Sequence, residues 1–159
     1  GLQMLAAALP AGLSELSIMF HGHRDFTDLG LGLLSASLPW TLNSLWLDFH
    51  SSKGFTDTGL QQLALALPAK LKRLELNFHC SGNFTDIGLM ALSAMLPRGL
   101  LALSMDFLCN INFTDECVGR VAATLPGGLQ KFHFAHKMSV QDSVASMQRR
   151  YSGRLASNE

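Results

Sequence analysis

Short segments in which apolar and polar residues alternate are each followed by a longer stretch with helical spacing. Segment 42–49 ends in strict alternation, with apolar residues at Leu42, Leu45, Leu47 and Phe49. This period of two is typical of a strand with one buried face. Segment 56–68 instead places leucines at Leu60, Leu63 and Leu67, the i, i+3 and i+7 spacing of a helix. The pattern therefore predicts a strand, a loop and a helix in each unit.

The same unit recurs every 29 residues. A Phe-Thr-Asp motif opens at Phe26, Phe55, Phe84 and Phe113, and the five prolines keep the same step at Pro10, Pro39, Pro68, Pro97 and Pro126. A period of about 20–50 residues sustained over several copies indicates a solenoid of stacked repeats rather than a closed globule.

The residues at the ends of each predicted helix suit those places. Thr56 is a good N-cap, because its hydroxyl can accept a hydrogen bond from a free N–H of the first turn. The next residue lies at the positive end of the helix dipole, and it is an aspartate in every copy: Asp28, Asp57, Asp86 and Asp115. We interpret these aspartates as structural, with a local role at each helix start, rather than as a cation site. Pro68 has no N–H to donate and helps to end the helix.

Two consecutive stretches carry a resemblance to a known family. Leu71-x-x-Leu74-x-Leu76-x-Phe78-x-Cys80, followed by Phe84-Thr-Asp-x-Gly88-Leu-x-x-Leu92-x-x-x-Leu96-Pro97, resembles a leucine-rich repeat. The helical half is similar to the ribonuclease-inhibitor type, and the cysteine after the strand (Cys80 and Cys109) is similar to that of the cysteine-containing repeats of F-box adaptors. The resemblance covers residues 1 to about 138. It implies an α/β fold, a leucine-rich-repeat solenoid shaped as a horseshoe arc, with parallel strands on the concave side and helices on the convex side.

This architecture sets the expected elements. Five parallel strands should begin near Leu13, Leu42, Leu71, Leu100 and Leu129. Helices are expected over about 27–38, 56–67, 85–96 and 114–125, after a partial first repeat that starts inside a helix. The repeats should occupy residues 1–138. A C-terminal capping helix is expected over 139–152, where Val140, Val144, Met147 and Tyr151 form one apolar stripe, and 153–159 is expected to be a flexible tail.

The N-terminal edge of the solenoid is predicted to be open. Leu2, Leu5 and Leu9 form an apolar stripe where a solenoid end normally has a polar capping element. A first strand near 13–20 would also have a free edge with unpaired backbone groups. We therefore expect the chain to be a piece of a longer protein, with upstream repeats or a partner subunit covering this edge. The isolated chain is expected to self-associate.

Composition narrows the function classes. The 159 residues are 48% hydrophobic, unlike a disordered chain. Twelve basic and twelve acidic residues give no net charge, so the basic excess of a general nucleic-acid or anionic-membrane binder is missing. No apolar stretch near the start approaches the ~20 residues that span a bilayer. Charged residues make up only 15%, against roughly 25% in soluble domains, which favours a surface partly covered by another molecule.

The outward face of the predicted sheet follows from the alternation. If Leu45, Leu47 and Phe49 point into the core, the residues between them point out. The same offsets in every repeat give the candidate partner-binding positions Glu15, Ser17, Met19, His21, Ser44, Trp46, Asp48, His50, Arg73, Glu75, Asn77, His79, Ser104, Asp106 and His133. This surface is mixed in charge and includes a tryptophan, a residue type enriched in binding hot spots. It is either a protein-binding face or a solvated surface without a ligand.

Histidines and cysteines raise the question of a metal site. His21, His50 and His79 occupy equivalent positions on strands about 4.8 Å apart, so stacked imidazoles could in principle share Zn²⁺. A straight ladder supplies its ligands along a line, however, and we expect no metal and no other cofactor. Cys80 and Cys109 stack one repeat apart, close enough for a disulfide, but the family resemblance implies free, half-buried thiols. Three cysteines, an odd number, also suit a reducing compartment, so an intracellular, cytoplasmic protein is expected.

No catalytic constellation is predicted. Ser44, Asp48 and His50 lie on neighbouring positions of one strand, which does not give a base oriented by a third group. We therefore expect a non-enzymatic protein–protein interaction module that binds another protein through the concave strand face, the open N-terminal edge, or both. Two alternatives remain. One is the substrate-recognition part of a ubiquitin-ligase adaptor, which would need an F-box-like segment upstream, and the other is a structural subunit or scaffold of a large assembly.

Overall fold

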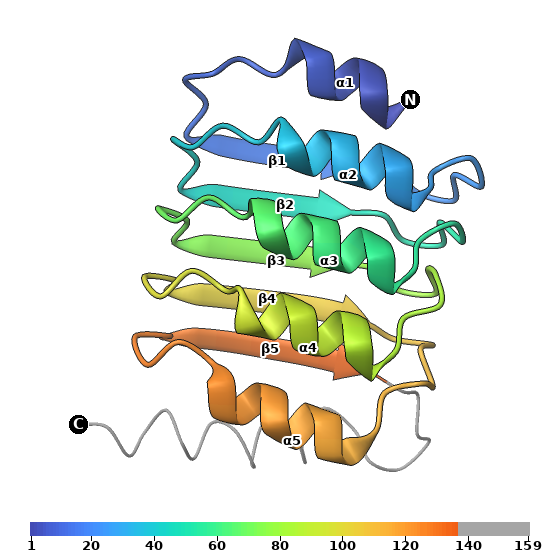
Figure 1. The fold of residues 1–159 in the computed structure, drawn as a ribbon, viewed down its shortest axis with the longest axis vertical. Coiled ribbons are helices and arrows are strands. Elements are labelled where there is room, and N and C mark those ends of the chain that lie inside the picture. Colours follow the sequence, from blue (N-terminus) through green and yellow to red (C-terminus); the bar gives the residue numbers. More distant parts are fainter. Residues whose placement is uncertain (137–159) are drawn as a thin grey trace.

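The repeats build a parallel sheet with a layer of helices on one side of it (Figure 1). The computed structural model describes residues 1–136. Its strands lie side by side in chain order: β1 (Glu15–Met19), β2 (Ser44–Asp48), β3 (Arg73–Asn77), β4 (Ala102–Phe107) and β5 (Lys131–His136). The helices are α1 (Leu2–Ala8), α2 (Asp28–Ala36), α3 (Asp57–Ala66), α4 (Asp86–Ala94) and α5 (Asp115–Thr124). The predicted α/β leucine-rich-repeat solenoid is confirmed.

Each strand begins two residues later than the sequence pattern suggests. The first leucine of the pattern, such as Leu42, belongs to a turn, in which its backbone N–H donates to the carbonyl oxygen of Pro39 at 3.1 Å. The same turn follows Pro68, Pro97 and Pro126. Leu42 is nevertheless fully buried. Alternation of polarity therefore cannot separate a buried turn from the strand that follows it.

Neighbouring strands pair with a constant offset of one repeat. Leu45 on β2, for example, lies opposite Leu16 on β1 and Leu74 on β3. Equivalent residues of all repeats consequently form straight rows across the sheet, which we call columns. Because side chains alternate along a strand, a column faces the same side of the sheet in every repeat.

Two columns of phenylalanine fill the interior next to the strand ends. Their central members, Phe49, Phe78, Phe107, Phe55, Phe84 and Phe113, are all buried. Phe78 and Phe107 are stacked with their ring centroids 5.6 Å apart. Phe84 meets both rings edge-on, with centroids 5.2 and 5.3 Å away. Each ring therefore contacts rings of its own repeat and of the next one. Phe49 points into the core, as strand alternation predicts.

The predicted threonine caps are present at three helices. The hydroxyl of Thr56 accepts a hydrogen bond from the backbone N–H of Thr58, and Thr85 accepts one from Ile87, both at 3.2 Å. Thr114 makes the corresponding bond one residue further along. The helices themselves are short, at 7 to 10 residues. Within residues 1–136, none is long and apolar enough to cross a membrane.

The aspartate after each threonine has a wider role than the local one predicted. Asp28 Oδ1 accepts a hydrogen bond from the backbone N–H of Thr56 at 2.8 Å, and its Oδ2 accepts one from the Thr56 hydroxyl at 2.5 Å. The same two bonds join Asp57 to Thr85 and Asp86 to Thr114. Each carboxylate therefore fixes the start of the following helix and holds adjacent repeats together.

The apolar residues of the first helix are better covered than expected. Leu2 is only 2% exposed, because it packs against α2 beside Gly30. Leu5 and Leu9 are partly buried against the core. The predicted apolar stripe is thus packed largely within the chain, which corrects that expectation, although β1 pairs only with β2 among the described strands. The capping helix predicted for 139–152 and the tail predicted for 153–159 lie outside the described residues.

Candidate interaction surface on the strand face

The sheet has one side turned away from the helices, which we call the strand face. Its side chains come from three columns: Glu15, Ser44, Arg73, Ala102 and Lys131; then Ser17, Trp46, Glu75, Ser104 and His133; then Met19, Asp48, Asn77, Asp106 and Ala135. The alternate residues, such as Leu45 and Leu47, are buried beneath them. Every strand position that alternation predicted to point outward therefore lies on this one surface.

The middle column crosses the centre of the strand face. Its largest side chain, Trp46, is 37% exposed and lies between Ser17 of β1 and Glu75 of β3. A partly exposed tryptophan held on a paired strand is a suitable anchor for a partner, because its ring adds contact area and its backbone is already fixed.

A hollow of about 370 Å³ lies over the last three strands of this face. It is lined by Arg73, Glu75, Ala102, Leu103, Ser104, Lys131, Phe132 and His133. The small residues Ala102 and Ser104 of β4 form its floor between longer side chains on both neighbouring strands. Two cationic groups and one carboxylate at the rim make the hollow suitable for an acidic or hydrogen-bonding group of a partner.

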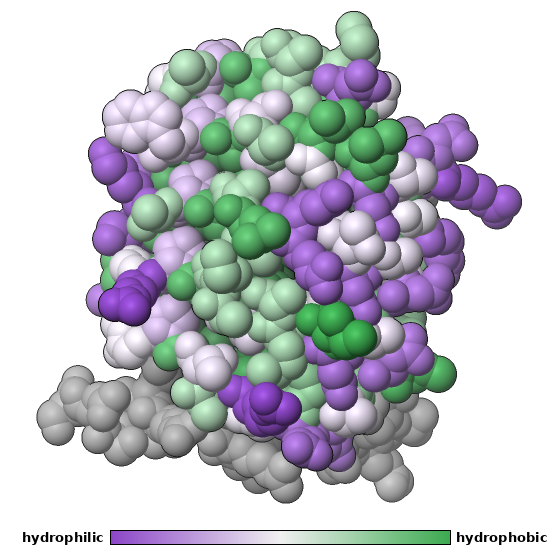
Figure 2. Space-filling view, viewed as in Figure 1, coloured by the Kyte–Doolittle hydropathy of each residue, from purple (hydrophilic) through white to green (hydrophobic). Residues whose placement is uncertain are grey.

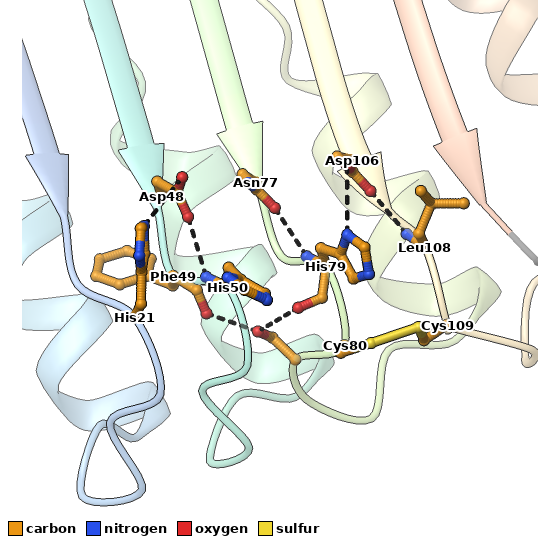
Figure 3. A network of polar contacts seen from close by, with 11 residues as sticks. His21, Asp48, Phe49, His50, Asn77, His79, Cys80, Asp106, Leu108 and Cys109 are labelled. Atoms are coloured by element: carbon orange, nitrogen blue, oxygen red, sulfur yellow. Dashed lines mark hydrogen bonds and ion pairs between the residues drawn. A yellow bond between two sulfur atoms is a disulfide. The ribbon is translucent and has the colours of Figure 1, made fainter.

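At the carboxyl ends of the strands, the third column makes local hydrogen bonds (Figure 3). Asp48 Oδ1 accepts the backbone N–H of His50 at 3.1 Å, and Asn77 Oδ1 accepts that of His79 at 3.0 Å. Asp106 Oδ1 binds the N–H two residues on in the same way, at 2.9 Å. Such Asx turns end β2, β3 and β4. Sequence reasoning missed this role, although the recurrence of Asp and Asn in one column was a signal for it.

The predicted histidines lie directly beyond these turns. His21 Nε2 is 3.3 Å from Asp48 Oδ2, and His79 Nδ1 is 3.9 Å from Asp106 Oδ2. The ring of His50 lies between the other two imidazoles, with centroid distances of 5.4 and 5.3 Å. Asp48 is only 8% exposed as a result. Its carboxylate serves the turn and His21, and it offers little surface to a partner.

A buried serine joins two of the turns. Ser81 Oγ donates a hydrogen bond to the carbonyl oxygen of Phe49 at 2.6 Å and accepts one from the backbone N–H of Ser52 at 2.9 Å. Both partners belong to the preceding repeat, so this hydroxyl holds the two loops in register. The sequence offered no signal for this position, because Ser81 reads as an ordinary polar loop residue.

The two loop cysteines are paired, which corrects the expectation of free thiols. Cys80 and Cys109 form a disulfide, with their Cα atoms 4.9 Å apart. Both have the same left-handed backbone conformation, with φ of 51° and 68°, so their side chains leave the backbone in the same direction one repeat apart. Cys117 is free and buried, which accounts for the odd number of cysteines. The imidazole of His79 lies beside the pair, and these three side chains could hold a metal ion.

Exposed hydrophobic side chains are not confined to the strand face. Figure 2 shows the helix-covered side, where apolar side chains lie among polar ones. The most exposed apolar residues on the helices include Met4, Leu29, Leu65 and Ile87. A second tryptophan, Trp40, is 68% exposed in the loop between α2 and β2, where the ammonium of Lys70 lies 4.6 Å from its ring centroid. The strand face is distinguished by its aligned, fixed side chains rather than by hydrophobicity.

Comparison with known proteins supports the fold. The chain is similar to a solved structure of leiomodin-1 actin-binding site 2, with a TM-score of 0.59 and 15% identity, over 98% of this chain and 92% of that one. It is also similar to the leucine-rich repeat-containing protein LegL7 from Legionella pneumophila, with a TM-score of 0.46 and 18% identity, over 80% of this chain and 40% of that one. No family model and no curated protein matches the sequence. At 15% identity the likeness to the leiomodin-1 structure concerns the fold alone.

Proposed function

We propose that this chain is a protein–protein interaction module whose partner binds on the strand face. The observation that carries the proposal is the position of Trp46, 37% exposed in the middle column of a sheet that fixes its backbone on both sides. Burying such a ring gives a large apolar contact, and little side-chain freedom is lost in the process. The fold offers this surface ready-made.

The partner that fits has an apolar group over Trp46 and an acidic or hydrogen-bonding group over the hollow. Arg73 and Lys131 contribute positive charge to the hollow, and Glu75, which lies opposite Trp46 on the neighbouring strand, contributes one negative charge. A partner segment that crosses the strands would meet both features in turn. The chain as a whole carries no net charge, so we expect local complementarity rather than long-range attraction to select the partner.

The proposal includes no catalytic activity. The Asp48 carboxylate accepts a hydrogen bond from the backbone N–H of His50 and lies beside the imidazole of His21. This arrangement ends a strand, and it does not orient a base toward a serine. A role as an interaction module does not require that the repeats belong to the ribonuclease-inhibitor type or to the F-box-adaptor type. Because the leiomodin-1 structure is described as an actin-binding site, actin is a purified protein to test early.

The two tryptophans provide a matched pair of variants. Trp46→Ala removes the proposed anchor, whereas Trp40→Ala removes an even more exposed indole from a loop outside the strand face. Proteins retained by the wild-type chain from a cell extract would be identified by mass spectrometry and purified. Their affinity for each variant would then be measured by calorimetry, after circular dichroism has shown that the variants are folded.

We expect Trp46→Ala to weaken binding about 30-fold, the roughly 2 kcal/mol typical of a hot spot. Trp40→Ala should change the affinity less than about twofold, as most surface substitutions do. Arg73→Glu should also weaken binding, because it reverses a charge in the hollow. A partner whose affinity depends on Trp40 and not on Trp46 or Arg73 would show that the binding surface lies elsewhere.

A further inference from the structure

We propose that His79, Cys80 and Cys109 bind one Zn²⁺ ion when the two cysteines are reduced. Within residues 1–136, they form the one group of at least three His, Cys, Asp or Glu side chains that could hold a metal ion, with all ligand atoms within 4.8 Å of one another. The site lies at the rim of the strand face, in the loops that follow β3 and β4 (Figure 3). It is separate from Trp46 and the hollow.

The spacing of the three donor atoms suits a tetrahedral ion. Zn–S bonds of about 2.3 Å and Zn–N bonds of about 2.0–2.1 Å place the ligands of such an ion about 3.5–3.8 Å apart. All three ligand atoms lie within 4.8 Å of one another, so small shifts bring them to this separation. When the disulfide is reduced, the two sulfurs move apart to van der Waals contact, which is close to the separation of two zinc-bound thiolates.

The donor set favours zinc over the common hard cations. Two thiolates and one imidazole are soft or intermediate ligands, which select Zn²⁺ rather than Mg²⁺ or Ca²⁺. Three protein ligands leave the fourth position to water. Cys109 is exposed, and His79 and Cys80 are half-buried, so an ion can enter from solvent without an opening of the fold.

The surroundings hold the ligands in place. His79 Nδ1 lies 3.9 Å from Asp106 Oδ2, which leaves Nε2 to the metal, and a carboxylate beside the other ring nitrogen is a frequent companion of zinc-binding histidines. Asn77 Oδ1 accepts the backbone N–H of His79 at 3.0 Å. The backbone N–H of Cys80 donates to the carbonyl oxygen of Leu108 at 2.9 Å. The backbone at both neighbouring ligands is thus fixed before a metal arrives.

Both cysteines occupy a column in which the backbone favours glycine. Gly22, Ser51, Cys80 and Cys109 share this column, with φ of 71°, 61°, 51° and 68°. Left-handed backbone is uncommon for residues with a side chain, and such residues concentrate at functional sites. Two successive repeats nevertheless carry cysteine there, each beside the same imidazole.

The disulfide and the zinc site exclude one another. Reduction by a phosphine breaks the S–S bond and gives two thiols, while the phosphine takes up the oxygen of one water molecule and becomes its oxide. The thiols then release two protons to solvent as zinc binds. The histidine column alone predicted no metal site, because its ligands lie along a line. The two cysteine sulfurs lie off that line.

Metal titration of the full 159-residue chain tests the proposal. The protein would be reduced with a phosphine, which is then removed under anaerobic conditions. Zn²⁺ would be titrated in competition with a chromophoric chelator, and Co²⁺ would serve as a spectroscopic probe. We expect one equivalent of Zn²⁺ to bind, and Co²⁺ to show thiolate charge-transfer bands with the visible bands of tetrahedral geometry. The same protein oxidised to the disulfide should bind no metal.

Variants separate this site from adventitious binding. Cys80→Ser, Cys109→Ser and His79→Asn should each weaken Zn²⁺ binding by more than about 100-fold, and Asp106→Asn should weaken it about 10–100-fold. Cys117→Ser and His21→Asn are the matched controls, since they change the same residue types outside the group, and they should bind zinc like the wild type. Equal binding by the oxidised protein or by Cys109→Ser, or loss of binding in Cys117→Ser, would overturn the proposal. Should a serine variant fail to fold, the oxidised wild-type chain gives the same answer without a substitution.

Discussion

The carboxylate of Asp57 accepts two hydrogen bonds from Thr85, one from its backbone nitrogen at 2.7 Å and one from its hydroxyl at 2.5 Å. The acceptor is charged, which makes such bonds stronger than those between neutral groups. Gly88 allows this approach, because a Cβ atom there would lie 3.0 Å from the Asp57 Cα. The pair joins the starts of α3 and α4 and is repeated at two other steps of the solenoid.

Asp57→Asn should therefore destabilise the chain. The carbonyl oxygen of the asparagine amide can still accept the Thr85 N–H. The NH₂ group, however, faces the Thr85 hydroxyl and cannot accept its hydrogen bond, and the negative charge is lost. We expect the free energy of unfolding in urea to fall by about 1–3 kcal/mol. Asp25→Asn, in an exposed loop, is the control and should change it by less than about 0.5 kcal/mol. Equal effects of the two substitutions would mean that the carboxylate does not couple the repeats.

Phe78→Ala should have a larger effect on stability. The ring is fully buried and contacts aromatic rings of its own repeat and of both neighbouring repeats, so its removal leaves a cavity that rigid neighbours cannot fill. We expect a loss of about 3–5 kcal/mol in the free energy of unfolding. Ile111→Ala, at a site that is 77% exposed, is the comparison for the same measurement. A loss below about 1 kcal/mol for Phe78→Ala would place the ring outside the core.

Two buried serines should respond in opposite ways. Ser81→Ala removes the hydroxyl that accepts from the Ser52 N–H and donates to the Phe49 carbonyl oxygen, and the N–H keeps only its 3.1 Å bond to that carbonyl. We expect a cost of about 0.5–1.5 kcal/mol, the usual net value of a lost hydrogen bond. Ser52 Oγ, by contrast, is buried without a hydrogen-bond partner. Ser52→Ala should leave stability unchanged or raise it, because it removes an unsatisfied polar group. Thermal unfolding of both variants checks this, and a destabilised Ser52→Ala variant would contradict it.

Cys117 should make stability depend on alkaline pH. Burial, followed by the hydrogen bond with Asp86 and its nearby charge, raises the pKa of this thiol from 9.0 to about 11. The unfolded chain loses this proton near its ordinary pKa, while the folded chain retains it. The contribution is therefore complete below pH 9 and is lost progressively between about pH 9 and 11. Urea unfolding at pH 8 and pH 10.5 should show a larger decline for the wild type than for Cys117→Ala, and a decline of equal size in both would contradict the assignment.

The orientation of the strand face could be predicted from the sequence because strand periodicity admits only two faces. Once Leu45 and Leu47 are assigned to the core, Trp46 must point away from it, and the 29-residue period extends this result to the other strands. The helix starts could also be predicted, since a Thr cap acts within one turn. These features depend on neighbours in the sequence.

Contacts between repeats were harder to predict. The sequence places Asp28 at a helix start but does not show that its carboxylate reaches Thr56 of the next repeat. The pairing of Cys80 with Cys109 depends on the left-handed backbone at both positions. Only glycine is a good sequence signal for that conformation, so it could not be predicted at a cysteine. Aspartate side chains are usually exposed, but the turn and His21 cover that of Asp48. In each case the deciding partner is far away in the chain.

The constant register has a consequence for how such a chain can change in length. Deleting residues 40–68 would join Pro39 to Ala69 and bring Thr85 to Asp28, the same kind of partner that Asp28 has now. A deletion that is not a multiple of the 29-residue period would shift the following repeats out of register with the phenylalanine columns. Unequal crossing-over between copies of the underlying coding segment would therefore yield folded proteins with narrower or broader strand faces. Each added copy could acquire its own side chain at the place of Trp46, so recognition can diversify while the scaffold is conserved.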